Sequence, residues 1–120
     1  MLLAPTLAKI DGLKPDATIS GMPSVMFVGV VVIGGEQGAK ALAQSGDARH
    51  FVLESFRHLK AIAALGARKE LLGAVHLPEN ADGVSIGDDG KLDAVLTPFI
   101  EAVGQHRVWS RRKMAESVPA

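Results

Sequence analysis

Two histidines and a glutamate recur at four-residue steps on one predicted helix, as ligands for zinc can. They are His50, Glu54 and His58, and a histidine pair at this spacing binds zinc when further ligands join it. The two histidines are eight residues apart, however, which separates them by roughly 12 Å along a helix axis. One ion cannot bridge that distance. We therefore interpret the three side chains as a solvated helix face and expect no metal site.

Two other groups of side chains have the chemistry of acids, bases or nucleophiles. Asp88-Asp89 has the residue types of a general acid and base, but adjacent carboxylates before a helix usually cap it and complement its dipole. Several serines are also present, yet none has the strand–turn–helix context of a nucleophile elbow: Ser24, Ser45, Ser55, Ser85 and Ser110. We therefore expect no catalytic residue among these side chains.

A glycine-rich loop, Gly34-Gly35-Glu36, follows a predicted strand and precedes a predicted helix, as a phosphate-binding loop does. It lacks the lysine and the serine or threonine of a P-loop, and it lacks the spacing of a dinucleotide fingerprint. A tight turn that needs positive φ accounts for the glycines without any ligand. We favour the turn, and phosphate binding is the alternative.

A second turn, Gly66-Ala67, lies between a predicted buried strand and a predicted helix. In many α/β enzymes such a turn holds a nucleophile at the carboxyl end of the sheet. Neither glycine nor alanine has a nucleophilic side chain, and the chain contains no cysteine. The turn therefore has the position of a catalytic site without the catalytic group.

The composition is typical of one globular domain. The chain has 120 residues, 48% of them hydrophobic, and a formal net charge of 0. A neutral chain has no overall field that attracts nucleic acid or an anionic membrane, and the longest apolar run, Val25 to Ile33, is too short to span a bilayer. We therefore expect a cytoplasmic protein with neither nucleic acid nor membrane as a partner. Near-zero charge also favours association.

Strands and helices alternate in the predicted order of elements. Apolar runs predict strands at Leu2 to Ala4, Ser24 to Ile33, Ala61 to Leu65 and Val84 to Ile86, the second and third of them buried on both faces. Helical patterns begin at Gly38, after a cap at Asp47, at Arg68 and at Asp88, and Pro98 kinks or splits the last of these helices. This alternation predicts an α/β fold with a mainly parallel sheet.

The C-terminal region is basic around a single tryptophan. Arg107, Arg111, Arg112 and Lys113 surround Trp109. The patch is short and the chain is neutral, so we expect a solvated tail from Ser110 rather than a nucleic-acid site, with Trp109 as a packing anchor for the last helix. These observations predict one domain over residues 1–112 and a flexible tail over residues 113–120.

Several blocks of the sequence together resemble the C-terminal domain of large-subunit haem catalases. In chain order they are Pro23 to Phe27, Val30 to Glu36, Gly46 to Glu54, Arg57 to Gly66, Gly83 to Asp88, Phe99 to Ala102 and His106 to Trp109. The resemblance extends from about Leu3 to Arg111. It implies a flavodoxin-like three-layer sandwich, similar to the DJ-1/PfpI and class I glutamine amidotransferase folds.

The resemblance also bears on the two glycine turns. In DJ-1/PfpI relatives a cysteine, often followed by histidine, occupies the positions that align with Gly66 and Ala67. Glycine cannot replace a thiolate nucleophile, so thiol chemistry is not carried over to this chain. The diglycine lies beside that site in the relatives, which implies a vestigial pocket formed by Gly34, Gly35, Glu36 and Gly66.

The implied role is that of a non-catalytic accessory domain in stability and oligomer packing. In such catalases hydrogen peroxide is dismutated at a haem in the core, and this chain has no tyrosine to serve as the haem ligand of a catalase. We therefore expect no cofactor in this chain, and either a catalase core or further copies of the chain as partners. The alternatives are a DJ-1/Hsp31-like binding or chaperone module and a small-molecule enzyme that uses the Gly34-Gly35-Glu36 loop.

The predicted series of strands also differs from that of a complete doubly wound sheet. A doubly wound sheet places its first strand at the centre, flanked by the second and third. Here the pattern begins with what should be the second strand, so we expect a domain without its first strand and helix. Unpaired backbone groups would remain in the sheet, and we expect them to promote association by strand exchange or edge pairing.

Overall fold

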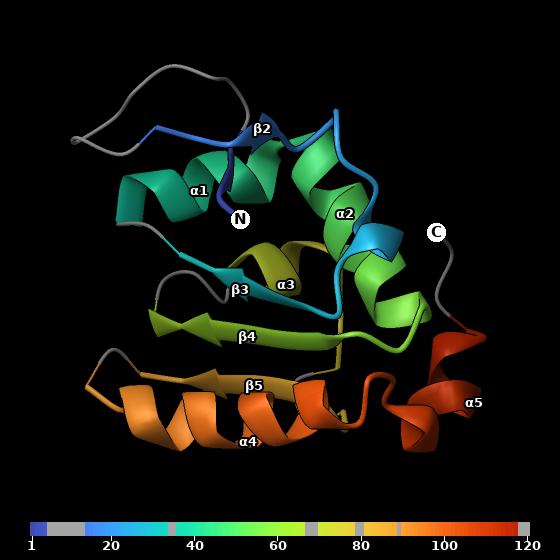
Figure 1. The fold of residues 1–120 in the computed structure, drawn as a ribbon. Coiled ribbons are helices and arrows are strands. Elements are labelled where there is room, and N and C mark those ends of the chain that lie inside the picture. The colour runs from blue at the N-terminus through green and yellow to red at the C-terminus, as the bar shows by residue number, and fades with distance from the viewer. Residues whose placement is uncertain (5–13, 34–35, 67–69, 79–80, 89, 118–120) are drawn as a thin grey trace.

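A parallel sheet of three strands, in the order β3-β4-β5, organises the structure (Figure 1). The computed structural model describes residues 1–4, 14–33, 36–66, 70–78, 81–88 and 90–117. The strands of this sheet are β3 (Gly29–Val32), β4 (Ala61–Leu65) and β5 (Val84–Gly87). All pairs in the sheet are parallel, which confirms the predicted sheet type.

Helices cover both faces of the sheet and complete a three-layer α/β sandwich, as the sequence predicted. On one face lie α1 (Glu36–Gln44), α2 (Gly46–Arg57) and α3 (Glu70–Ala74), and on the other lies α4 (Leu92–Gly104). Three short elements complete the central and C-terminal parts: the 3-10 helices η1 (Ser24–Met26) and η3 (Trp109–Arg111), and α5 (Arg112–Ala115). Among the described residues, no helix has both the length and the apolar character to cross a membrane.

The central strand β4 is buried on both faces. Its residues alternate: Ile62 and Ala64 belong to the core cluster with Phe56 of α2, and Ala61 packs with Ala102 of α4. Small and β-branched side chains permit this arrangement, because both helical layers must approach one strand closely. The two-sided burial predicted for Ala61 to Leu65 is therefore confirmed.

The first strand of this sheet is shorter and more open than predicted. The predicted strand from Ser24 to Ile33 contains η1 at its start, and only Gly29–Val32 form β3. Val32 is buried, but Val31 retains 41% exposure. Burial on both faces is thus wrong for β3, because α4 packs over β4 and β5 and β3 lies at the edge of the sheet.

The N-terminal segment forms a separate two-stranded sheet. β1 (Leu3–Ala4) pairs in parallel with β2 (Ala17–Thr18). The Leu2 N–H donates to the Asp16 carboxylate at 2.7 Å, and the Asp16 N–H donates to the Leu2 carbonyl at 2.8 Å. The predicted N-terminal strand is confirmed, and it belongs to a sheet other than the one that contains β3.

Three predicted helix starts need correction. The helix α1 begins at Glu36 rather than at Gly38. The cap of α2 is Ser45, whose hydroxyl accepts the Ala48 N–H at 3.3 Å, and Asp47 lies within the first turn. The helix α4 begins at Leu92 rather than at Asp88, and Asp89 lies outside the described residues, as does the predicted start of α3 at Arg68. A serine hydroxyl and an aspartate carboxylate are equivalent cap acceptors, so the sequence alone did not separate Ser45 from Asp47.

The last long helix runs through its proline without a break. Pro98 lies inside α4 and removes one N–H that would bond to the carbonyl four residues earlier, at Ala94. Both residues are exposed, so water can hydrate that carbonyl. Of the two predicted outcomes, a split at Pro98 is wrong.

Arg111 joins the C-terminus to the body of the domain. It is 2% exposed. Its Nη1 donates to the Asp82 carbonyl at 2.8 Å, and its Nη2 donates to the carbonyls of Phe56 and Lys60 at 3.0 and 2.6 Å. The guanidinium also lies 4.3 Å from the centroid of the Phe56 ring. One side chain therefore connects the end of α2 with the segments that lead into β4 and β5.

Burial lowers the pKa of Arg111 to about 10, while the nearby charge of Asp82 acts in the opposite direction. The side chain thus remains a cation at neutral pH, and its hydrogen bonds to carbonyls are charge-assisted.

A solvated tail from Ser110 is therefore wrong at Arg111, and also at Ala115, which is buried. Trp109 is 64% exposed, so its predicted role as a packing anchor is wrong; the buried neighbour Val108 packs instead, with Ala61 and Ala102. Residues 118–120 lie outside the described residues, and flexibility over 113–120 stays a prediction.

We expect the substitution Arg111→Met to lower the free energy of unfolding by about 2 to 4 kcal/mol, because it removes three charge-assisted hydrogen bonds to backbone carbonyls. Urea denaturation measures this change. The matched control is Arg112→Met, since Arg112 is exposed and exposed changes usually stay within about 0.5 kcal/mol. Equal effects of the two substitutions would contradict the role of Arg111.

Candidate functional site

The predicted vestigial pocket is only partly within the described residues. Gly34, Gly35 and Ala67 lie outside them. Gly66 follows β4 with φ of 55°, in the left-handed region that favours glycine, and Glu36 is the exposed first residue of α1. Neither Gly66 nor Glu36 lines the large cavity of the structure. The conformation of Gly66 agrees with a structural role at the turn.

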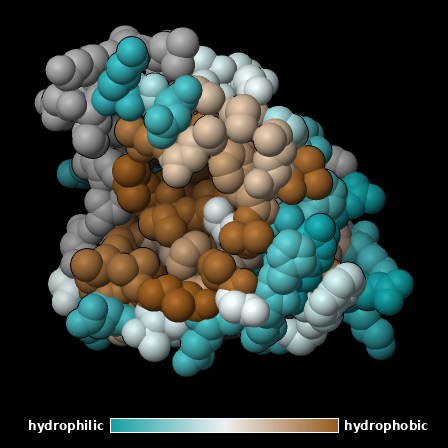
Figure 2. Space-filling view, in the orientation of Figure 1, coloured by the Kyte–Doolittle hydropathy of each residue, from teal (hydrophilic) through white to brown (hydrophobic). Residues whose placement is uncertain are grey.

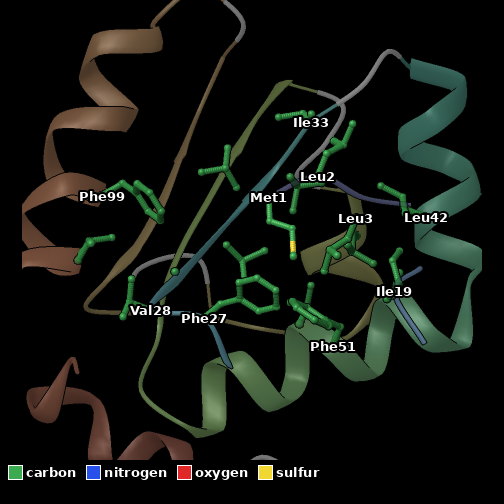
Figure 3. A pocket seen from close by; sticks show the side chains of 18 residues that line it. Met1, Leu2, Leu3, Ile19, Phe27, Val28, Ile33, Leu42, Phe51 and Phe99 are labelled. Atoms are coloured by element: carbon green, nitrogen blue, oxygen red, sulfur yellow. The ribbon is translucent and has the colours of Figure 1, made fainter. Parts of the chain in front are cut away.

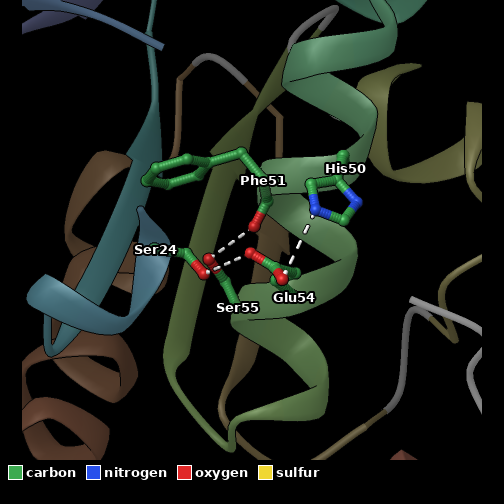
Figure 4. Close-up of polar contacts among 5 residues, drawn as sticks. All are labelled: Ser24, His50, Phe51, Glu54 and Ser55. Atoms are coloured by element: carbon green, nitrogen blue, oxygen red, sulfur yellow. Dashed lines mark hydrogen bonds and ion pairs between the residues drawn. The ribbon is translucent and has the colours of Figure 1, made fainter. Parts of the chain in front are cut away.

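A serine, a glutamate and a histidine come together on α2 and η1 (Figure 4). The Ser24 hydroxyl donates to Glu54 Oε2 at 3.4 Å, and His50 Nε2 lies 3.4 Å from Glu54 Oε1. In a hydrolytic triad the histidine lies between the serine and the carboxylate, so that it can accept the serine proton. Here the glutamate lies in the middle. The arrangement therefore holds η1 against α2 and does not activate the serine.

The second histidine of this helix and one further serine also have structural positions. His58 is the C-cap of α2, beyond the last helical residue. The Ser55 hydroxyl donates to the Phe51 carbonyl one turn earlier, at 2.8 Å. Across the part of the chain that the structure describes, no three histidine, aspartate or glutamate side chains are grouped closely enough to hold a metal ion.

The main concave site is an apolar groove along the edge of β3. It has a volume of about 500 Å³, and the described residues that line it are all methionine, leucine, isoleucine, phenylalanine, valine, alanine or glycine. Figure 2 shows hydrophobic side chains gathered around a hollow on this face of the molecule. Such a lining can bury apolar surface, but it holds no side chain that can bind a charge or move a proton.

The groove has an apolar wall on each face of the sheet (Figure 3). On one side lie Phe51 of α2 and Leu42 of α1, with Phe27 beside them, and on the other side of β3 lies Phe99 of α4. The Phe27 and Phe51 rings are 5.9 Å apart between centroids. Met1 also lines the groove, so the N-terminal segment forms part of its boundary. The floor between these walls is β3 itself.

The outer edge of β3 also has backbone groups. Val28 accepts the Ala61 N–H through its carbonyl. Successive peptide groups of a strand point to opposite sides, so Val30 also faces β4, whereas Gly29 and Val31 face outward. Among the described residues, no strand pairs with this edge. The groove therefore combines apolar walls with a row of outward backbone donors and acceptors.

Comparison of the sequence with known proteins shows the family of this chain. The sequence profile of the C-terminal domain found in long catalases matches residues 1–113. This chain belongs to that family. The resemblance inferred from the sequence blocks is thereby confirmed.

Curated relatives of this catalase C-terminal domain are much longer proteins. Catalase HPII of Pseudomonas putida is 45% identical over 125 residues, which cover 100% of this chain and 17% of the relative. Catalase-B of Dictyostelium discoideum is 33% identical over 126 residues, which cover 100% of this chain and 18% of the relative. The chain thus spans less than a fifth of the length of these relatives.

The sequence did not reveal the groove, although each of its walls was within a predicted element. Phe51 and Phe99 lie within two of the predicted helices, and Val31 lies within a strand that was predicted to be buried. These residues lie in separate parts of the chain, and only the fold brings them to one edge. The available signal was the expected absence of a first strand, because that absence leaves one strand without a neighbour.

Gly29 allows the Phe99 wall to approach β3. A Cβ on Gly29 would lie 2.9 Å from Phe99 Cζ and 3.1 Å from Val103 Cγ2. We therefore expect Gly29→Ala to lower the free energy of unfolding by about 1 to 3 kcal/mol through overpacking, as measured by urea denaturation.

The matched control for this substitution is Gly38→Ala. Gly38 lies in α1, and a Cβ there would meet nothing within 4 Å. This change should stabilise the protein by up to about 1 kcal/mol, because alanine favours the helix. A neutral Gly29→Ala would show that Phe99 does not pack on β3 as described.

Proposed function

We propose that this chain is a non-catalytic accessory domain of a long catalase, which contributes stability and packing within the catalase assembly. The observation that carries the proposal is the chemistry of its main concave site. Among the described residues, the groove is lined by apolar side chains and glycine, so these residues offer buried contact area rather than an acid, base or nucleophile. Membership of the C-terminal domain family supports the same assignment.

In this proposal, hydrogen peroxide is dismutated at haem in another part of the catalase. The relatives are named as catalases, and this chain covers only 17% of the P. putida protein. The chain has no tyrosine and cannot supply the tyrosinate that ligates iron in catalases. Its contribution would therefore be mechanical: it would hold apolar surfaces together and exclude water from them.

The expected strength of packing follows from the exposed apolar residues. Val28, Val31 and Ile33 lie along the groove and are 42%, 41% and 52% exposed. Complete burial of such a side chain contributes about 1.5 to 3 kcal/mol, and these residues, already half-buried, would each contribute less. Several of them together could still stabilise an assembly by a few kcal/mol.

A second surface has the composition of a contact site. Trp109, Arg57 and Arg107 line a smaller hollow of about 250 Å³, and Trp109 is largely exposed. Tryptophan and arginine are enriched in protein interfaces. This surface supports the proposal that the partner is a protein, either the catalase core or another copy of the chain.

The exposed groove also favours a second candidate function, the binding of unfolded proteins in the manner of a chaperone. A contiguous apolar surface can hold such clients. Suppression of client aggregation by the isolated chain, at ratios near one to one, would favour this candidate. No suppression would leave the accessory role as the better assignment.

The accessory role can be tested in Catalase HPII of P. putida by deletion of the region that matches this chain. We expect the shortened protein to retain its haem absorbance and peroxide turnover, with loss of activity at a lower temperature, because packing contributes stability and not chemistry. Oxygen release after heating to a series of temperatures measures the effect. An unchanged inactivation profile would contradict the proposal.

The isolated chain provides the complementary experiment. Titration with haem should give no shifted Soret band, and the mixture should release no oxygen from hydrogen peroxide beyond that of free haem. A stoichiometric spectral change with turnover would place catalysis in this chain and would overturn the accessory role.

A further inference from the structure

We infer that the small hollow at the end of α2 binds one carboxylate of a partner protein, with Arg107 as the binding residue and Trp109 as an apolar wall. The hollow has a volume of about 250 Å³ and shares none of its described lining residues with the groove along β3. The inference rests on the proposed accessory function, because it names the chemical group through which this domain recognises its protein partner.

Two turns of the chain build the hollow. Leu59 follows the C-cap of α2 and His106 follows that of α4, and both have φ of 64°. This left-handed conformation turns the chain away from each helix axis. The Val108 N–H donates to the Leu59 carbonyl at 2.7 Å, which holds the two turns together. Arg57 and Arg107 therefore line the same hollow.

The guanidinium of Arg107 is not neutralised within the described part of the chain. Its Nη1 is buried without a hydrogen-bond acceptor, and no described carboxylate pairs with it. Burial and, as a second cause, the charge of Arg107 lower the pKa of Lys60. An anion in the hollow would offset this repulsion between two cations. Because a guanidinium can hold a carboxylate through two parallel N–H donors, a carboxylate suits Arg107.

The helix dipole does not account for this cation. A basic residue in the last turn of a helix complements the negative end of the dipole, and Arg57 has that position in α2. Arg107 lies outside the helices, between α4 and η3. Its place at the hollow is therefore left for a ligand to explain.

The size and lining of the hollow favour a carboxylate on a short apolar stem. Cofactor-sized ligands occupy roughly 300 to 1,000 Å³, so about 250 Å³ suits a single side chain. No described lining residue is acidic, and Val25 and Trp109 present apolar surface beside the arginine. The carboxylate would lie at Arg107, and its methylene groups would lie against Val25 and Trp109.

The surface around the hollow indicates that a protein supplies the carboxylate. Met26, Trp109 and Arg57 are all exposed, and these three residue types are enriched in protein interfaces. A small hydrated anion has no use for this apolar rim. The matching partner surface presents an aspartate or glutamate among apolar neighbours.

The test uses sodium propionate, which reproduces the end of a glutamate side chain, and the complete chain of 120 residues. Trp109 is the single tryptophan and tyrosine is absent, so the emission of the protein reports on the hollow. At constant ionic strength we expect a saturable change in emission at millimolar propionate, since so small a ligand binds weakly. Propionamide, the neutral analogue of similar shape, should give no saturable change, and N-acetyl-tryptophanamide provides the baseline of free indole.

A set of variants locates the binding residue. Arg107→Gln should weaken propionate binding about fivefold or more, because the charged donors are lost. Arg107→Lys keeps the charge without the paired donors and should bind with intermediate strength. Arg112→Gln is the matched control, since Arg112 is exposed and does not line the hollow; it should leave binding unchanged. Circular dichroism and urea denaturation verify folding, and the comparison of propionate with propionamide needs no variant.

Several results would overturn the inference. They are an equal response to propionamide, full binding by a folded Arg107→Gln variant, and inorganic phosphate binding at least as tightly as propionate, which would indicate a site for free oxyanions. A dimer that Arg107→Gln dissociates would assign the hollow to self-association instead. The accessory function fails separately: it fails if deletion of the domain leaves heat inactivation unchanged, whether or not propionate binds.

Discussion

The constraint on which this structure depends is the pairing of strands in its parallel sheet. A strand in such a sheet needs a neighbour on each side and a helical layer on each face. The central strand β4 has all four: it pairs with β3 and β5, and α2 and α4 pack on its two faces. The strand β3 has one neighbour, and Val31 is consequently exposed. The apolar groove is the direct result, because the helical walls continue past the last paired strand.

The amino-terminal ends of β4 and β5 are held together by a different interaction. Arg111 brings together three carbonyls that precede β4 and β5 or end α2, and its guanidinium stacks on Phe56. This cation lies in a region that the sequence presents as a basic tail. The domain is therefore well connected near its C-terminus and open along β3. The open apolar edge along β3 gives the molecule a defined side for contact, which agrees with the proposed accessory role in a larger catalase.

Local patterns in the sequence predicted where helices and strands form. They predicted less well which residues pack around each helix or strand. The run Ala61 to Leu65 identified β4, because a short apolar run bounded by polar and turn residues is typical of a buried strand. The run Ser24 to Ile33 looked equally buried, and nothing within it distinguishes a central strand from an edge strand. Arg111 was missed for a similar reason: its partners Asp82 and Phe56 are 29 and 55 residues away, and backbone carbonyls leave no signal in the sequence. The glycine turn at Gly66 was predictable, since its positive φ is a local property.

The central claim is that β3 offers an unpaired edge, and amide hydrogen exchange of the isolated chain tests it most directly. At concentrations where the chain is monomeric, we expect slow exchange for the N–H groups of Val30 and Val32, which face β4, and fast exchange for those of Gly29 and Val31, which face the groove. Equal protection of all four amides in the free monomer would contradict the claim, because it would mean that the edge of β3 is already paired.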